Sequence, residues 1–167
     1  MLVCHQAGGD GNPEGCKPCR DSFVVRRDRR RVPLNEAEKA YLAGIVDGEG
    51  TVTLVKNHKN ETPTPSVSIA NNSLKLLEWV KVKVGGVIVS KKKYKLHHHD
   101  SYAWSVRQDR AIRLLGDIKK YLIIKRPQAE LITRRYKTVT HRAGKYTSEM
   151  LNKKMLLVAE IRKLNQR

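Results

Sequence analysis

The sequence of 167 residues contains no run of 18 apolar residues and only three cysteines. Without such a run, no membrane-spanning helix is expected. The first 16 residues, MLVCHQAGGDGNPEGC, have neither the basic flank nor the apolar stretch of a secretory signal. Three cysteines are an odd number, whereas a secreted disulfide framework favours an even one. We therefore expect an intracellular protein (cytoplasm, nucleoid or organelle) that is not secreted.

Acidic residues are also scarce, because 16 Asp and Glu stand against 34 Lys and Arg, which gives a net charge of +18. A charge of this size attracts polyanions over a long range, and nucleic acid is the leading partner on that ground. An anionic membrane surface is the weaker alternative, because no long basic amphipathic helix stands out. We expect no membrane partner and no small-molecule substrate.

Residues 1–32 differ in composition from the rest of the chain. They begin rich in Gly and Pro (GGDGNPEG) and end in a cluster of arginines, so we expect an irregular basic extension. Cys16-Lys-Pro-Cys19 has zinc-knuckle spacing, and Cys4 or His5 could complete four zinc ligands. The alternative is an extension without bound metal, since there is no second Cys-x₂-Cys pair.

Hydrophobic periodicity in residues 33–167, which we expect to form a single domain, predicts alternating helices and strands. Asn35 and Glu38 form a capping box at the start of the first helix, and Gly48 and Gly50 end it. Strands are expected at 51–57, 65–70, 87–96 and 102–107, and later helices start at Ser73, Asp109, Pro127 and Ser148. The last of these helices is predicted to bury Leu151, Met155, Val158 and Ile161. Two hairpins, each followed by a helix, imply an antiparallel sheet with helices on one face, an α+β domain.

The segment Leu42–Gly50 (LAGIVDGEG) combines small residues on a helix with a carboxylate between two glycines. Ala43 and Gly44 permit the close approach of a second helix. Glu49 would stand at the helix C-terminus, where the helix dipole disfavours an anion. A hard cation such as Mg²⁺, bound by Glu49 and the Gly48 carbonyl, would resolve this conflict. The alternative is an ordinary helix end with an exposed glutamate.

This segment closely resembles the nine-residue signature of the LAGLIDADG homing endonucleases. Leu42, Ala43, Gly44, Asp47 and Gly50 match it identically. In this chain Glu49 stands in place of the second aspartate and adds one methylene, and Gly48 stands in place of an alanine. The predicted elements also fit the αββαββα unit of the family, so the resemblance covers roughly residues 35–164. It implies a saddle-shaped antiparallel sheet of four strands, followed here by extra C-terminal helices.

The resemblance implies an intron-encoded enzyme that cleaves a long, near-palindromic site in double-stranded DNA by metal-dependent hydrolysis. In the family, the eighth signature residue binds the metal where the signature helices of two units meet. This implies Glu49 and the Gly48 carbonyl as ligands of Mg²⁺ or Mn²⁺. Lys125 resembles the basic residue of the active site, and Asn71 a polar residue that organises water. Asn72 is a rival for Asn71, and Lys75 is a weaker candidate for a further basic group.

Only one signature is found in the chain, since Leu114-Leu115-Gly116-Asp117 continues as Ile-Lys-Lys. A single unit implies a homodimer, and C₂ pairing is its simplest form. Two Glu49 carboxylates near the axis would repel each other unless cations lay between them, which suits two-metal hydrolysis. The resemblance places the dimer interface at Leu42, Ala43, Gly44 and Asp47.

The second face of the sheet is predicted to be polar and to bind DNA. A β-ribbon can enter the major groove, where each base pair shows a distinct pattern of donors and acceptors. The histidines at 97–99 and the nearby lysines suit phosphates better, because three adjacent histidines do not easily converge on a metal. The residues predicted for this face are Thr51, Thr53, Asn57, Lys59, Ser66, Ser68, Ser90, Lys92, Ser105 and Arg107.

Three other functions compete with the endonuclease. An RNA-binding intron maturase and a DNA-binding regulator without catalysis can both be built on the same fold. The acid at Glu49 and the basic group at Lys125 favour the nuclease over these two. A basic RNA binder of the ribosomal type would explain the charge but not LAGIVDGEG.

Overall fold

The computed structural model describes residues 33–56, 58, 61–91, 100–140 and 146–166. All of them belong to one compact unit, Val32–Arg167. The predictions for the basic extension and its Cys4, Cys16 and Cys19 lie outside the described residues. So do those for Asn57, Lys59, Lys92 and His97–His99.

The order of elements confirms the predicted αββαββα unit with two additional helices. The elements are α2 (Glu36–Glu49), β1 (Gly50–Val55), β2 (Thr64–Asn71), α3 (Leu74–Val84), β3 (Val87–Ser90), β4 (Tyr102–Arg107), α4 (Gln108–Ile118), α5 (Arg126–Arg135) and α6 (Ser148–Leu164). The capping box is present, because the Asn35 side chain accepts from the Glu38 N–H at 2.8 Å and Glu38 returns the bond at 3.1 Å. Some boundaries differ: β3 ends at Ser90 within the strand predicted at 87–96, and β1 ends at Val55 within the strand predicted at 51–57. Asp109 lies in the first turn of α4, which starts at Gln108 without a side-chain cap.

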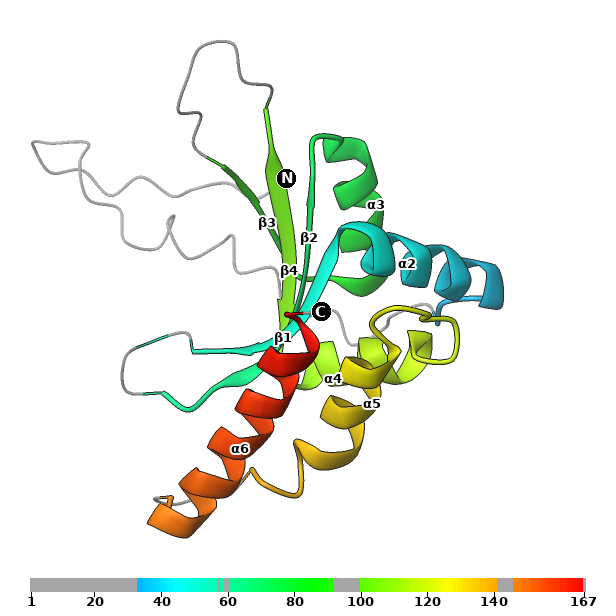
Figure 1. The fold of residues 1–167 in the computed structure, drawn as a ribbon. Helices are drawn as coiled ribbons and strands as arrows, with labels where there is room; N and C mark the ends of the chain where they lie inside the picture. Colours follow the sequence, from blue (N-terminus) through cyan, green and yellow to red (C-terminus); the bar gives the residue numbers. More distant parts are fainter. Residues whose placement is uncertain (1–32, 57, 59–60, 92–99, 141–145, 167) are drawn as a thin grey trace, which may run out of the picture. The chain divides into compact units, whose positions relative to one another are not determined.

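The four strands form one antiparallel sheet in the order β1-β2-β4-β3. Figure 1 shows α2, α3, α4 and α5 on one side of this sheet, which is the arrangement that the sequence predicts. No helix of the described part of the chain lies over the opposite face of the sheet (Figure 1). The sheet therefore has a helix-covered face and an open face.

The core lies between the helices and the covered face. The side chains of Val52, Val67, Ile69 and Trp104 are completely buried. The Trp104 indole N–H donates to the Gly85 carbonyl at 2.8 Å, which ties the end of α3 to β4. Next to it, a Cβ atom on Gly86 would lie 2.6 Å from the Ser105 carbonyl oxygen, at a φ of +96°. Both the close approach and the positive φ require glycine at this position.

Helix α6 packs against β1 and α5. At its C-terminal end the Asn165 side chain donates to the Val52 carbonyl at 3.1 Å, which satisfies an acceptor on the edge strand. Val158 and Ile161 are buried as predicted, but Leu151 and Met155 are 40% and 39% exposed, so that half of the predicted stripe is wrong. Among the described residues no helix has the length and apolar character needed to cross a membrane.

Candidate active site and nucleic-acid interface

Helix α2 has an inward face and an outward face. Leu42, Ala43 and Val46 are completely buried in the core of the same chain. The prediction that Leu42 and Ala43 contact a second chain is therefore wrong in its choice of face. The exposed face carries small residues at helical spacing instead, namely Ala37, Ala40, Gly44 and Gly48. A Cβ atom on Gly44 or Gly48 would meet no atom within 4 Å, so this face is open in the single chain.

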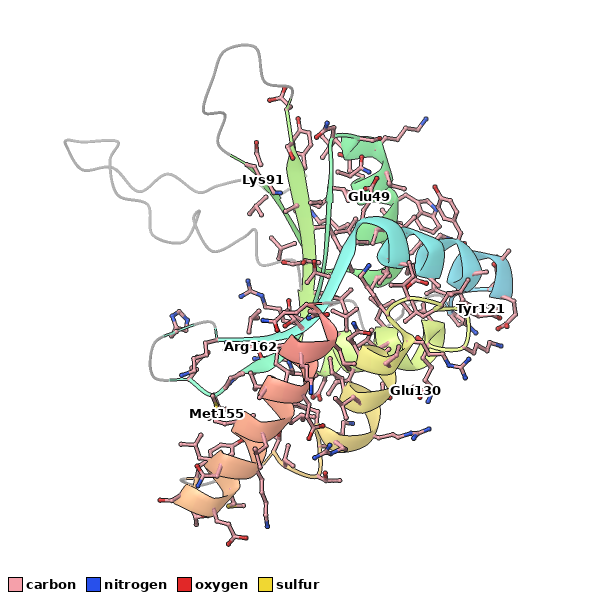
Figure 2. All side chains as sticks on the ribbon, in the orientation of Figure 1. Glu49, Lys91, Tyr121, Glu130, Met155 and Arg162 are labelled. Carbon is pink, nitrogen blue, oxygen red and sulfur yellow. The ribbon has the colours of Figure 1, made fainter. Side chains whose placement is uncertain are left out.

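Glu49 is the last residue of α2 and its side chain is exposed. Figure 2 shows it where α2 passes into β1. The amide nitrogen of Asn71, the last residue of β2, donates to Glu49 Oε2. The amide oxygen of Asn71 accepts from the Ser73 N–H at 2.6 Å, which fixes the side chain in this orientation. Of the two candidates Asn71 and Asn72, the structure brings Asn71 to Glu49.

Asp47 lies in the same helical turn but has different hydrogen-bond partners. Its carboxylate accepts backbone N–H bonds from Ile123 (2.6 Å), Ile124 (3.3 Å) and Lys125 (2.9 Å). The Lys125 ammonium in turn donates to the Asp47 carbonyl oxygen at 2.5 Å. These bonds hold Lys125 at the end of α2, two residues from Glu49. Asp47 is thus bonded within its own chain, and its assignment to the interface between chains stays a prediction.

The start of α2 is tied to the same segment that follows α4. Glu36 accepts from the Lys120 ammonium at 2.6 Å, from the Lys39 ammonium at 2.7 Å and from the Tyr121 hydroxyl. The bonds from Lys120 and Lys39 hold the pKa of Glu36 below its ordinary value. Figure 2 shows Tyr121 near the start of α2, whereas Glu49 lies at the end. Residues 119–125 therefore fasten α2 at both ends.

The chemistry of the residues at the end of α2 suits a divalent cation. A helix leaves its last carbonyls without partners inside the helix. The Val46 carbonyl accepts from Gly50 N–H and the Asp47 carbonyl from Lys125, so Gly48 supplies the next carbonyl beside the Glu49 carboxylate. Such oxygens are the ligands that Mg²⁺ and Ca²⁺ prefer. Within the described ranges no group of three or more His, Cys, Asp or Glu side chains converges on one point. The nearby Asp47 carboxylate is taken up by the backbone N–H groups of residues 123–125, so Glu49 is the acid that this helix end presents to solvent.

The open face of the sheet carries rows of hydroxyl groups. The register aligns Thr51 with Ser68 and Ser105 in one row, and Thr53 with Ser66 and Arg107 in the next. Ser66 is only 6% exposed, because its neighbours cover it, which corrects its predicted place among the residues that contact DNA. In the register Ser90 aligns with Tyr102 and Asn71, which alternate with the open-face residues and so lie on the helix-covered face of the sheet. The prediction that Ser90 lies on the open face is therefore wrong. Val87 and Val89, which are 60% and 55% exposed, take that place in β3. A shallow groove lies beside them, lined in part by Ser105, Arg107 and Arg110.

No protein-family model and no curated protein sequence matches this chain. Solved structures do match it. The homing endonuclease I-CvuI, solved with a DNA target in the presence of Mg, shares 18% identity over 77% of this chain and 82% of its own, with a TM-score of 0.57. The LAGLIDADG meganuclease I-AabMI, bound to uncleaved DNA, shares 23% identity (75% of this chain, 44% of its own, TM-score 0.55). The LAGLIDADG homing endonuclease I-LtrWI, bound to target DNA, shares 18% identity (89% and 53%, TM-score 0.55).

These similarities define the class of structure: an α+β fold in which a helix-covered antiparallel sheet leaves one face open. The fold is that of the LAGLIDADG homing endonucleases. The chain spans most of I-CvuI but only about half of I-AabMI and I-LtrWI.

Glu49, Asn71 and Lys125 stay predicted site residues, and the sequence did not indicate the contacts that hold them. The hydrogen bonds of Asp47 join residues that are 76 to 78 positions apart in the sequence. No local sequence pattern predicts a contact over that separation. The pairing of Asn71 with Glu49 likewise follows from the β1–β2 register, which sets Gly50 opposite Ile69.

Proposed function

We propose that this chain is a site-specific, metal-dependent endonuclease for double-stranded DNA that belongs to the LAGLIDADG family and acts as a homodimer. One observation carries the proposal: Glu49, at the exposed end of α2, is bonded to Asn71 while Lys125 is held beside the same helix end. An acid, an amide and an ammonium then meet next to a sheet face lined with hydroxyl groups. This is a combination that phosphodiester hydrolysis can use.

Glu49 and the Gly48 carbonyl would hold the cation, which we propose to be Mg²⁺ or Mn²⁺. When bound, such an ion lowers the pKa of water and neutralises charge on the phosphate. Asn71 keeps one Glu49 oxygen in place and leaves the other free for a ligand. Lys125, fixed through Asp47, places a positive charge where the phosphate becomes more negative during the reaction.

A pair of chains would bring two such acids together, because among the described residues the end of α2 presents Glu49 alone to solvent. The exposed small residues of α2, with Gly44 and Gly48 at their centre, allow a second helix to approach closely. C₂ pairing along this face would set the two Glu49 residues near the axis. The coverage supports this view, because the chain matches most of I-CvuI but about half of two longer LAGLIDADG enzymes.

DNA would lie on the open faces of the two sheets. Threonine and serine hydroxyls can donate to and accept from base edges, and Arg107 can pair with guanine. A dimer carries a formal charge of 2 × 18 = +36, so binding weakens steeply as salt rises. Two copies of one surface read a near-palindromic site, since the symmetry of the protein is mirrored in the target.

The experiment is selection of cleaved sites from a random duplex library with Mg²⁺, followed by the variant Glu49→Gln on the selected site. Cleavage is expected to fall at least about a hundredfold, because the carboxylate ligand is lost, while binding measured in Ca²⁺ changes less than about threefold. The control is Glu78→Gln, which removes an exposed carboxylate of α3 and should leave cleavage unchanged. Cleavage by Glu49→Gln at the wild-type rate contradicts the mechanism. If the wild-type chain selects no site at all, the RNA-binding maturase becomes the better explanation.

A further inference from the structure

Lys154 of α6 is a buried lysine whose side chain serves no part of the proposed active site. Only 1% of the residue is exposed. Its ammonium donates to the hydroxyl oxygens of Thr62 at 2.9 Å and Tyr146 at 3.0 Å. It also lies 5.0 Å from the ring centres of both Tyr136 and Tyr146. The cation is therefore held in one place by groups from the segment before β2, the end of α5 and the start of α6.

The charge of Lys154 is not neutralised by these contacts. Among the described residues the ammonium has no carboxylate within ion-pair distance, and a third N–H donor has no acceptor. Removing an ammonium from water is costly unless an anion compensates it. A surface lysine would not pose this problem, because water would solvate it.

A cavity of about 330 Å³ adjoins this ammonium. Thr64 and Thr140 are among the residues that line it, and the hydroxyl oxygen of each is buried without a hydrogen-bond partner in the described part of the chain. Asp109 and Lys137 also line the cavity. Together with Lys154 they give the cavity two positively charged side chains and one negatively charged side chain. The cavity thus combines a buried cation with two unsatisfied hydroxyl donors.

We propose that this cavity is a phosphate-binding pocket, with Lys154 as its charged donor and Thr64 and Thr140 as neutral donors. A phosphate group has several strong acceptor oxygens, which can receive the free N–H of the ammonium and both hydroxyl hydrogens at once. A neutral ligand would leave the charge of Lys154 uncompensated, and a cation would be repelled by it. The pocket uses none of the residues assigned to the active site.

Two sources could supply the phosphate group. Thr64, at the start of β2, shares the alternation of Ser66 and Ser68 on the open sheet face, whereas the other residues that line the pocket come from α4, α6 and the segments before β2, after α5 and before α6. A phosphodiester of a nucleic acid on that face and free inorganic phosphate therefore share the required chemistry.

The test is calorimetric titration of the full chain with inorganic phosphate, at constant ionic strength, with chloride as the reference anion. Saturable binding of one phosphate per chain is expected. Lys154→Met should weaken it at least about tenfold, because a charge-assisted hydrogen bond is lost. Lys153→Met, which removes the exposed neighbour in the same helix, should leave it unchanged. An absence of saturable binding, or an unchanged dissociation constant in Lys154→Met, overturns the proposal.

A second variant keeps the test valid if Lys154→Met does not fold. Thr140→Val removes a hydroxyl at nearly constant size and should weaken phosphate binding about threefold or more, whereas the exposed Thr138→Val should not. Equal binding by Thr140→Val and the wild-type chain contradicts the pocket.

Repeating the titration with duplex DNA already bound identifies the source of the phosphate group. Phosphate that no longer binds indicates a DNA phosphodiester, and phosphate that still binds indicates the free ion. Because the first titration contains no DNA, a failure of the nuclease proposal would not affect its result.

Discussion

At the scale of single residues, Asp47 and Glu49 show that two acids of one helix can have different partners because they point in different directions. Residues two apart point about 200° away from each other around the axis. Asp47 accordingly meets the loop after α4, while Glu49 meets Asn71 at the end of β2. Asp47 therefore positions Lys125, and Glu49 is free to bind a ligand.

The variant Asp47→Asn tests this positioning role. An amide replaces the carboxylate that accepts three backbone N–H bonds, so the free energy of unfolding should fall by about 2 kcal/mol. Hydrogen exchange at the amides of Ile123 and Lys125 should become faster, because these donors lose a charged acceptor. Urea unfolding and exchange mass spectrometry measure the two effects.

Asp117→Asn is the control for this variant, because Asp117 is an exposed aspartate in the last turn of α4. It should change neither stability nor exchange at residues 123–125. Unchanged exchange at those amides in Asp47→Asn would mean that the loop does not depend on the carboxylate.

The sequence predicted the residue types of the site better than their contacts. Glu49 and Lys125 followed from the resemblance, and both lie at the end of α2. The choice between Asn71 and Asn72 needed the register of β2, because adjacent strand residues point to opposite faces. The buried Lys154 could not be predicted either, since lysine is almost never fully buried without a partner.

At the scale of the elements, local signals predicted order and type well and orientation less well. The capping box of α2, the proline in the first turn of α5 and the glycines after α3 act within a few residues of chain, so their effects are visible in sequence. Periodicity identifies residues that share a helix face but does not say which partner that face meets. For this reason half of the predicted stripe of α6 is exposed. The resemblance likewise names Leu42 and Ala43 together with Gly44 as a dimer contact, although the first two are buried in their own chain.

Acid should loosen the attachment of α2 through Glu36. Because Lys120 and Lys39 lower the pKa of this carboxyl in the folded chain, its contribution to stability is complete above its unfolded pKa of about 4.3. The contribution is lost as the pH falls through the lower folded pKa. Glu36→Gln should therefore be less stable than the wild-type chain at pH 7 and should approach it at lower pH. Urea midpoints between pH 7 and pH 3 measure the difference.

The matched substitution Glu78→Gln removes an exposed carboxylate for which no ion pair is found among the described residues. Its difference from the wild-type chain should be smaller and nearly constant with pH. If the difference for Glu36→Gln is also constant with pH, the ion pairs of Glu36 do not contribute to stability.

At the scale of the whole molecule, the two sides of α2 differ. The inner face is buried in the core of its own chain, and the outer face presents small residues to solvent. In the proposed dimer, folding and assembly would therefore depend on opposite sides of one helix. A substitution on the outer side should alter assembly without unfolding the chain.

Gly44→Leu provides that substitution. A side chain at this position meets no atom of its own chain, and leucine favours the helix more than glycine does, so stability should be unchanged or higher. The dimer should be lost, because leucine prevents close contact between two α2 helices. Sedimentation at micromolar concentration measures the change of mass. Gly116→Leu is the control, since this glycine of α4 is also exposed and its added side chain also meets no atom. A dimer that survives Gly44→Leu would place the interface elsewhere.

The rows of short hydroxyl side chains on the open face have a consequence for engineering. Thr51, Thr53, Ser68 and Ser105 are partly or fully exposed and lie over a core that is built from the alternate residues of the same strands. Longer side chains such as Gln, Asn or Arg can replace them without a change in that core. In the proposed endonuclease these positions could be varied together in a combinatorial library, so that new target preferences would be selected on an unaltered scaffold.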